Sequence, residues 1–169
     1  MDLIVRPGGV AEWAGIRLRC AVGRGGILAE KREGDGGTPV GAWPMRELLY
    51  RPDRVERGAP QTGGLPARAI RREDGWCDAP EDPAYNRSVR LPYPASAERL
   101  WRRDRVYDLI VPLGYNDDPV VPGAGSAIFL HLAKRDYSPT AGCVALSRRD
   151  LLRVLEGSDR RSRVIVEPD

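Results

Sequence analysis

Glycine and proline interrupt this sequence so often that it cannot form many long helices. Its 169 residues include 19 glycines and 15 prolines. The segment from Pro80 to Pro94 is especially rich in proline, and each proline removes a helical hydrogen-bond donor. Glycine and proline instead mark turns. The sequence therefore predicts a mainly β fold of short strands and long loops, with a few short helices.

The length fits one domain, which we place over residues 1–169. Alternating or short apolar segments predict about eight to ten strands. They cover residues 3–5, 17–21, 27–29, 43–50, 65–70, 106–113, 127–132, 144–146 and 163–167. Two short helices are expected over residues 96–101 and 148–155, where Ser96 and Ser147 can cap them. Asp74 and Gly75 are expected to form a turn.

The charge pattern argues against a nucleic-acid-binding surface. The formal net charge is only +3, and acidic residues are interspersed among the arginines, whereas nucleic-acid binders carry a patch of one sign. The longest apolar run, residues 127–132, is too short to span a membrane. The N-terminal residues also lack the basic and apolar regions of a signal peptide. A cytoplasmic location therefore stays open, and the oligomeric state is not predicted.

The cysteine and histidine content does not predict a metal or cofactor site. The three cysteines, Cys20, Cys77 and Cys143, have no CxxC spacing, and the chain has one histidine. These are too few ligands for a usual zinc site. A disulfide between Cys20 and Cys77 stays open, although two free thiols are favoured.

That one histidine, His131, lies twelve positions before Cys143, which directly follows Gly142. A Cys–His site needs a thiol, a base and backbone N–H donors for an oxyanion, and this stretch contains all three. Both residues also have a structural interpretation, because a histidine in an apolar strand and a lone cysteine are commonly buried in a core. Papain-like enzymes place the cysteine upstream of the histidine, so the order found here argues against that arrangement.

Two stretches resemble the active-site motifs of the L,D-transpeptidase (YkuD) family. In the first, His131 is followed by SPTAGCV over residues 138–144, where the family has Ser/Thr-His-Gly-Cys and an apolar residue. The second is GDGGTPVG over residues 34–41, similar to the family's TPxG loop. The resemblance implies a YkuD-like β-sandwich or barrel without cofactors. It also implies acyl transfer on peptidoglycan stem peptides, in the periplasm or cell envelope.

The resemblance also implies roles for individual residues. Cys143 is the expected nucleophile and His131 the general base, oriented by the backbone carbonyl of Leu132. The backbone N–H groups of Gly142 and Cys143 are the expected oxyanion donors. The imidazole is expected to lower the pKa of the thiol from about 8.5 toward neutrality. Five residues are expected to bind substrate, namely Tyr115, Asn116, Tyr137, Ser138 and Thr140.

The chain departs from the family pattern in ways that leave the reaction open. Ala141 replaces the second histidine of the motif, and Ala145 stands where many members carry a polar residue or arginine. The spacer between His131 and Cys143 is also shorter than usual. One alternative to transpeptidation is hydrolysis of cell-wall peptides by a carboxypeptidase or amidase. Another is a catalytically silent domain that binds the cell wall or serves a structural role.

Overall fold

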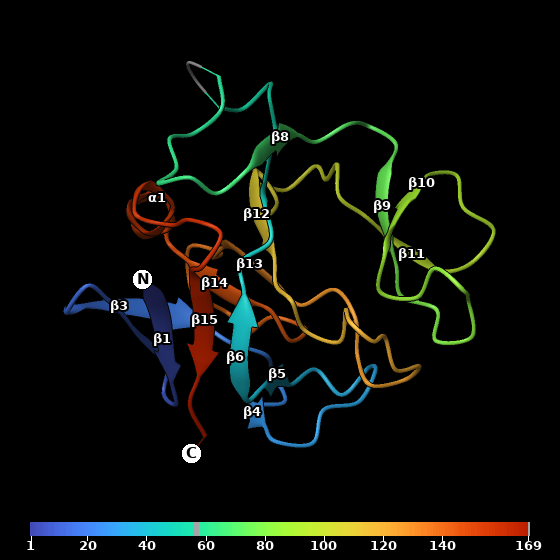
Figure 1. The fold of residues 1–169 in the computed structure, drawn as a ribbon, viewed down its shortest axis with the longest axis horizontal. Helices are drawn as coiled ribbons and strands as arrows, with labels where there is room; N and C mark the ends of the chain where they lie inside the picture. The colour runs from blue at the N-terminus through green and yellow to red at the C-terminus, as the bar shows by residue number, and fades with distance from the viewer. Residues whose placement is uncertain (56–57, 169) are drawn as a thin grey trace.

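Short strands dominate a computed structural model that describes residues 1–55 and 58–168 (Figure 1). Residues 56, 57 and 169 of the predicted domain therefore lie outside the described residues. The described part contains fifteen strands and a single helix. The prediction of a mainly β fold is confirmed. The predicted number of strands was too low, and the strand expected over residues 43–50 is divided in two. The strands that were not expected are Val10–Trp13, Thr38–Pro39, Asp74–Cys77, Ser88–Arg90 and Ala97–Arg99.

Ten strands form one large curled sheet (Figure 1). Its order is β6-β15-β1-β2-β3-β14-β13-β12-β7-β8. The bounds are β1 Asp2–Arg6, β2 Val10–Trp13, β3 Ile16–Ala21, β6 Gly41–Pro44, β7 Leu48–Tyr50, β8 Ala67–Ala69, β12 Leu109–Pro112, β13 Phe129–Leu132, β14 Val144–Leu146 and β15 Arg163–Val166. Most neighbours are antiparallel, but three pairs run parallel, namely β1 with β15, β13 with β14, and β7 with β8.

Two smaller sheets flank the large one. The first has the order β10-β9-β11, with β9 Asp74–Cys77, β10 Ser88–Arg90 and β11 Ala97–Arg99. It lies to one side of the large sheet, on the right in Figure 1. The second pairs β4 Ile27–Leu28 with β5 Thr38–Pro39 in parallel. Strand β5 is part of the TPxG loop, and β4 lies before that loop in the sequence.

The central strands β12, β13 and β14 are buried along their whole length. Successive side chains of a strand point to opposite faces, so each strand contributes to two layers. Leu130 and Val144 belong to the main core, which also contains Leu151 of the helix. Phe129 and Cys143 belong to a second apolar cluster on the other face. The candidate site therefore lies in a second, smaller layer that the three-stranded sheet helps to cover.

The single helix, α1 (Arg148–Glu156), has the predicted position and caps. The Ser147 side chain accepts a hydrogen bond from the N–H of Asp150 (3.1 Å), and Gly157 ends the helix. The apolar side chains Leu151, Val154 and Leu155 share one face and are fully buried. The sequence identified this helix from the spacing of Leu151, Leu152 and Leu155, of which Leu151 and Leu155 lie on the buried face.

Two local predictions were wrong. Residues 96–101 do not form a helix, because Ala97–Arg99 pairs with β9 as strand β11. Asp74 and Gly75 do not form a turn but begin strand β9. In both cases pairing with strands distant in the sequence overrides a weak local signal from serine, aspartate and glycine.

Among the described residues, no helix is long and apolar enough to cross a membrane. Cys20, Cys77 and Cys143 are all free and buried.

A buried ion pair ties the approach to β12 to the rest of the fold. Asp108 is fully buried, and its Oδ1 accepts a hydrogen bond from Nη1 of Arg54 (2.8 Å). Arg54 also donates to the backbone carbonyls of Arg103 (3.0 Å) and Asp104 (2.7 Å). The segment that leads to Tyr107 is therefore held by one guanidinium group.

We predict that Asp108→Asn lowers the free energy of unfolding by about 2 kcal/mol, because it weakens a charge-assisted hydrogen bond in a buried position. Urea unfolding would measure the change. Asp104→Asn is the matched control, since Asp104 pairs with Arg102 at the surface and should cost less than about 1 kcal/mol. Equal losses in the two variants would contradict the importance assigned to Asp108.

Candidate active site

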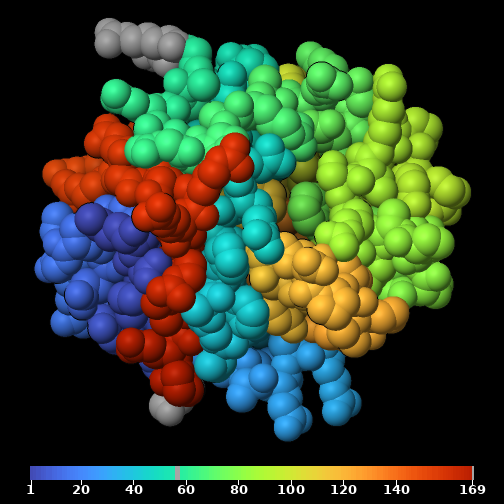
Figure 2. All heavy atoms as spheres, viewed as in Figure 1, coloured from blue at the N-terminus to red at the C-terminus, as the bar shows by residue number. Residues whose placement is uncertain are grey.

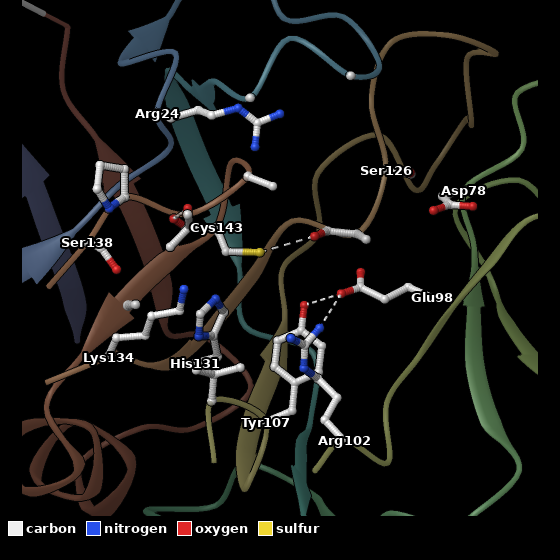
Figure 3. A pocket seen from close by; sticks show the side chains of 18 of the residues that line it. Arg24, Asp78, Glu98, Arg102, Tyr107, Ser126, His131, Lys134, Ser138 and Cys143 are labelled. Atoms are coloured by element: carbon white, nitrogen blue, oxygen red, sulfur yellow. Dashed lines mark hydrogen bonds and ion pairs between the residues drawn. The ribbon is translucent and has the colours of Figure 1, made fainter. Parts of the chain in front are cut away.

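The register between β13 and β14 brings His131 and Cys143 to the same face of the sheet. His131 pairs with Ala145, and Leu130 pairs with Val144. Cys143 precedes Ala145 by two residues, so its side chain projects on the same side as that of Ala145. The thiol therefore lies diagonally opposite the imidazole on the neighbouring strand, within reach of it. Figure 3 shows both side chains directed into one pocket.

The imidazole of His131 is held in one orientation. Its Nδ1 lies 2.9 Å from the backbone carbonyl oxygen of Leu132, so Nδ1 carries the proton that it donates. The contact with Leu132 that the family resemblance implied is therefore present. The ring also packs edge-to-face against Tyr107, with centroids 5.2 Å apart. These contacts leave Nε2 as the unprotonated nitrogen that can accept a proton.

Burial determines the charge of this histidine. His131 is 6% exposed, and loss of water around the ring lowers its pKa to about 4. The hydrogen bond to Leu132 opposes this shift only in part. The imidazole is consequently neutral at pH 7.

Cys143 forms the buried end of the same pocket. Its Sγ accepts a hydrogen bond from the N–H of Phe129 (3.4 Å) and donates one to the carbonyl oxygen of Ala127 (3.3 Å). Burial raises the pKa of the thiol to about 12, and the negative charge of Glu98 adds to the shift. This differs from the expectation of a pKa near neutrality. The reason is that the imidazole is itself neutral and offers no positive charge to a thiolate.

Residues 140–143 form a turn that ends at the predicted nucleophile, Cys143, and we call it the nucleophile turn. The hydroxyl of Thr140 organises this turn. This hydroxyl donates to the carbonyl oxygen of Cys143 (2.6 Å) and accepts from the N–H of Gly142 (3.1 Å). The Gly142 N–H is thus already engaged within the turn. Among the described residues, the Cys143 N–H has no hydrogen-bond acceptor, so it is the better placed of the two predicted oxyanion donors.

Three glycine-containing segments meet directly behind this turn. A Cβ on Gly23 would lie 2.1 Å from the carbonyl oxygen of Gly36 and 2.9 Å from Cα of Gly142. Gly142 has φ of +137°, and a Cβ there would lie 2.8 Å from the carbonyl oxygen of Gly37. Backbone contacts this close leave no room for side chains. Glycine is therefore required at positions 23 and 142 by backbone packing against the TPxG loop.

Thr38 connects these segments with two hydrogen bonds. It is fully buried, and its hydroxyl donates to the carbonyl oxygen of Gly142 (2.9 Å) and accepts from the N–H of Gly23 (2.8 Å). The N–H of Arg24 adds a bond to the carbonyl oxygen of Thr140 (2.9 Å). The two family motifs, far apart in sequence, thus form one unit.

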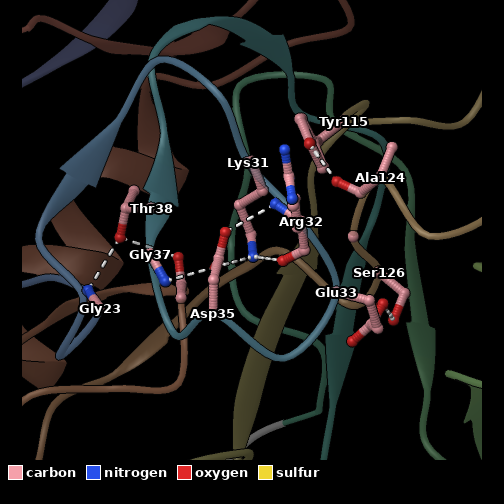
Figure 4. A network of polar contacts seen from close by, with 12 residues as sticks. Gly23, Lys31, Arg32, Glu33, Asp35, Gly37, Thr38, Tyr115, Ala124 and Ser126 are labelled. Carbon is pink, nitrogen blue, oxygen red and sulfur yellow. Dashed lines mark hydrogen bonds and ion pairs between the residues drawn. The ribbon is translucent and has the colours of Figure 1, made fainter.

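The TPxG loop also forms the rim of the pocket (Figure 4). Asp35 Oδ1 accepts from Nζ of Lys31 (2.5 Å) and from the N–H of Gly37 (2.8 Å). Although burial raises the pKa of Asp35, its hydrogen bonds outweigh that effect and lower it. Glu33 binds the hydroxyl groups of Tyr85 and Ser126, which fixes the loop to the segment before β13. In Figure 2 the blue segment that contains the loop lies against the orange segment that precedes β13. The N–H of Glu33 donates a hydrogen bond to the carbonyl oxygen of Gly123 (2.8 Å).

The resulting cavity has a volume of about 410 Å³ and is rich in charged groups. Basic groups come from Arg24, Lys31, Arg102 and Lys134, and acidic groups from Glu33, Asp78 and Glu98. Cys143 and His131 lie on its wall together with Ala141 and Ala145. The two positions at which this chain departs from the family motif therefore both face the cavity. Small side chains there leave space beside the thiol and the imidazole.

The predicted substrate-binding residues divide into two groups. Thr140 and Ser138 line the cavity. Tyr137 instead packs beneath the guanidinium of Arg19, at 4.3 Å from its ring centroid, and lines a different hollow. Tyr115 packs against Trp43 in the main core. Asn116 closes its own loop by bonding the carbonyl oxygens of Val121 and Gly125. The structure does not bring Tyr137, Tyr115 or Asn116 to the cavity wall, and their roles in substrate binding stay predictions.

Several cavity residues were not identified from the sequence. Tyr107 donates a hydrogen bond to Oε1 of Glu98 (2.6 Å), and Arg102 lies over the Tyr107 ring at 4.9 Å. Burial raises the pKa of Glu98 and that of Tyr107. No local signal marked Glu98, which the sequence assigned to a helix. Tyr107 could have been suspected, because it stands at the start of an apolar strand that pairs with the strand of His131.

Among residues 1–55 and 58–168, no three histidine, cysteine or acidic side chains are grouped so as to hold a metal ion.

We predict that Thr38→Val destabilises the protein by about 2 kcal/mol, because it leaves the Gly142 carbonyl and the Gly23 N–H without their buried partner. Thermal or urea unfolding would measure this loss. Thr38→Ser keeps the hydroxyl and should recover most of the stability. Equal destabilisation by valine and serine would contradict this assignment, because the hydroxyl would then contribute no more than the methyl group.

Comparison with known proteins identifies the family. A model of the YkuD L,D-transpeptidase catalytic domain matches residues 3–166. Among solved structures, the chain is similar to the helical cell shape determining protein Pgp2 from Campylobacter jejuni, with 15% sequence identity and a TM-score of 0.45. The structure of a lysine-to-alanine variant of Pgp2 matches with 16% sequence identity and a TM-score of 0.43. No curated protein matches the chain.

The aligned region covers 99% of this chain and 47% of the Pgp2 chain, so the chain spans about half the length of that protein. The family model, in contrast, extends over nearly all of the present sequence and includes the TPxG loop, His131 and Cys143. The chain belongs to the YkuD family of L,D-transpeptidase catalytic domains.

Proposed function

We propose that this protein is a cysteine acyltransferase acting on peptidoglycan stem peptides in the periplasm or cell envelope. Residues 1–169 are proposed as one catalytic domain. The observation that supports this most strongly is the placement of the Cys143 thiol and the free face of His131 in one charged cavity. The hydrogen bond from Nδ1 to Leu132 adds support, since it leaves Nε2 ready to accept a proton.

In the proposed first half-reaction, the sulfur of Cys143 attacks the carbonyl carbon of a substrate amide. The thiol proton passes to Nε2 of His131 as the S–C bond forms. The N–H of Cys143 binds the developing oxyanion. When the intermediate collapses, the C–N bond breaks, and His131 returns the proton to the leaving amine. A thioester between Cys143 and the substrate acyl group remains.

In the second half-reaction an acceptor attacks the thioester carbonyl. His131 removes a proton from the acceptor, the C–S bond breaks, and the proton returns to the sulfur. An amine acceptor gives transpeptidation, and water gives hydrolysis. We favour the amine because of the family, while Ala141 and Ala145 keep hydrolysis as the alternative. These two positions enlarge the space in which the acceptor would lie.

The reaction can be tested by incubating the purified protein with muropeptides, with and without an added amine acceptor, and weighing the products. We expect release of D-alanine and a product that contains the acceptor. Release without any acceptor product would assign a hydrolase.

Cys143→Ala and His131→Ala should each reduce product formation by at least about 10³-fold, because both groups act as one unit. Cys20→Ala is the matched control, since Cys20 is also a buried free thiol but lies in the main core, and it should keep most of the activity. Equal activity in the three variants, or none in the wild type under all conditions, would favour a catalytically silent domain.

The burial of the site predicts an unusual pH dependence. His131 must be neutral to accept the thiol proton, and burial lowers its pKa to about 4. The rate constant kcat/KM should therefore fall about tenfold per pH unit only below about pH 4. The thiol, with a pKa of about 12, should add no change up to about pH 11.

Steady-state kinetics with a substrate that does not titrate in this range would measure the profile. A decline centred near pH 6.5, the ordinary value for histidine, would contradict a neutral, buried pair. A rise in rate centred near pH 8.5 would indicate that a preformed thiolate is the reactive species.

A further inference from the structure

A second hollow, lined by arginine, adjoins the candidate active site. Its volume is about 520 Å³. The hollow is lined by six arginines, one tryptophan and one aspartate. They are Arg51, Arg54, Arg72, Arg99, Arg102, Arg103, Trp101 and Asp104. These residues come from three separate segments of the chain, so their convergence is a product of the tertiary fold. We refer to this set as the arginine hollow.

Half of these arginines have a carboxylate partner. Arg51 pairs with Asp53 (2.8 Å), Arg54 with Asp108 (2.8 Å) and Arg102 with Asp104 (2.6 Å). The other three, Arg72, Arg99 and Arg103, have no acidic partner among the described residues and are exposed. The arginine hollow therefore carries about three uncompensated positive charges, close to the whole formal net charge of +3.

The centre of the hollow is a rigid, partly apolar platform. The guanidinium carbon of Arg51 lies 3.8 Å from the Trp101 ring centroid, and that of Arg72 lies 4.9 Å from it. Arg51 is only 3% exposed and is further held by the carbonyl oxygen of Arg102 (2.6 Å). Arg51 is occupied by Asp53, so it orders the platform, and the unpaired Arg72 stacked on Trp101 is the pre-ordered group that can bind a carboxylate with little loss of conformational freedom.

Arg102 joins the hollow to the cavity that contains Cys143. It lines both spaces and packs over Tyr107, whose hydroxyl bonds Glu98 (Figure 3). An extended molecule whose amide lies at Cys143 can therefore continue past Arg102 into the arginine hollow. The part of the cavity wall next to Arg102 carries the acidic groups of Glu98 and Asp78, which would repel carboxylates there, whereas Arg24 and Lys134 lie on the side of Cys143 (Figure 3). The negatively charged groups of a ligand are therefore expected to bind beside the unpaired arginines of the hollow.

We propose that the arginine hollow binds carboxylate groups of an acidic peptide while the reacting amide of that peptide lies in the adjacent cavity. The proposal rests on the proposed function, because it assigns part of the substrate to the same site. It makes Arg72, Arg99 and Arg103 specificity-determining residues outside the catalytic pair.

Binding can be measured separately from catalysis with Cys143→Ala protein. Isothermal titration with a purified muropeptide would give its Kd, and the same muropeptide with its carboxyl groups converted to amides is the second ligand. Replacing Arg72, Arg99 and Arg103 together by glutamine should weaken binding of the acidic muropeptide about tenfold, since exposed ion pairs contribute modestly. Binding of the amidated muropeptide should change less than about twofold.

A matched control separates local contacts from overall charge. Replacing Arg17, Arg160 and Arg161 by glutamine removes the same number of charges from exposed positions outside the hollow. This control should leave the Kd of the acidic muropeptide within about twofold. Equal weakening in both triple variants, or equal weakening for the amidated ligand, would overturn the proposal. So would wild-type binding of inorganic polyphosphate as tight as that of the muropeptide, because the hollow would then be a general polyanion site.

Measuring muropeptide turnover with protein that retains Cys143 distinguishes failure of the proposed function from failure of the proposed binding site. If muropeptides are processed and the arginine variants leave KM unchanged, the arginine hollow is not a substrate site although the proposed function stands. If the arginine variants weaken binding selectively but no turnover occurs, the proposed function fails and the binding site remains. Selective weakening together with a KM raised about tenfold at unchanged kcat is the result that supports both.

Discussion

The candidate site depends on direct contact between the backbones of three glycine-containing segments. The Thr38 hydroxyl connects two of these segments by hydrogen bonds. That hydroxyl joins Gly23 to Gly142 across more than a hundred positions of sequence, in a place where no water is available to replace it. Because Gly23 and Gly142 leave no space for a Cβ, the backbone of the nucleophile turn can approach the TPxG loop directly. The position of Cys143 is thereby set by main-chain contacts, which are stiffer than side-chain contacts.

Burial of the central strands on both faces explains the electrostatics of the site. One face of β12–β14 contributes to the main core, and the other supports Phe129, His131 and Cys143. Removing water from both groups lowers the pKa of the imidazole and raises that of the thiol. The pair is therefore neutral at rest. A thiolate would form only as the sulfur attacks, when the negative charge moves on to the substrate oxygen near the Cys143 N–H.

The same architecture accounts for the distribution of charge around the site. The three-stranded sheet and the segment that leads into β12 bring Glu98, Arg102 and Tyr107 to the cavity. Arg102 is held by Asp104 and lies over the Tyr107 ring, so it separates a cavity with groups of both signs, including Glu98 and Asp78, from a hollow that is mainly basic. A ligand crossing this boundary meets charges of both signs, which favours recognition of a molecule with a defined order of charged groups.

Much of the fold and the central pair could be predicted from the sequence alone, because their signals are local. The density of glycine and proline excluded long helices, the spacing of Leu151 and Leu155 identified α1, and the order of His131 and Cys143 with the TPxG loop indicated the family. The remaining features depend on contacts between distant segments. Strand β11 forms where a helix was expected, because pairing with β9 overrides a serine cap. Tyr115, Asn116 and Tyr137 lie near the motifs in sequence but point into other parts of the molecule. The shifted pKa values and the arginine hollow were decided only by the tertiary structure, since burial and charge density are properties of the packed chain.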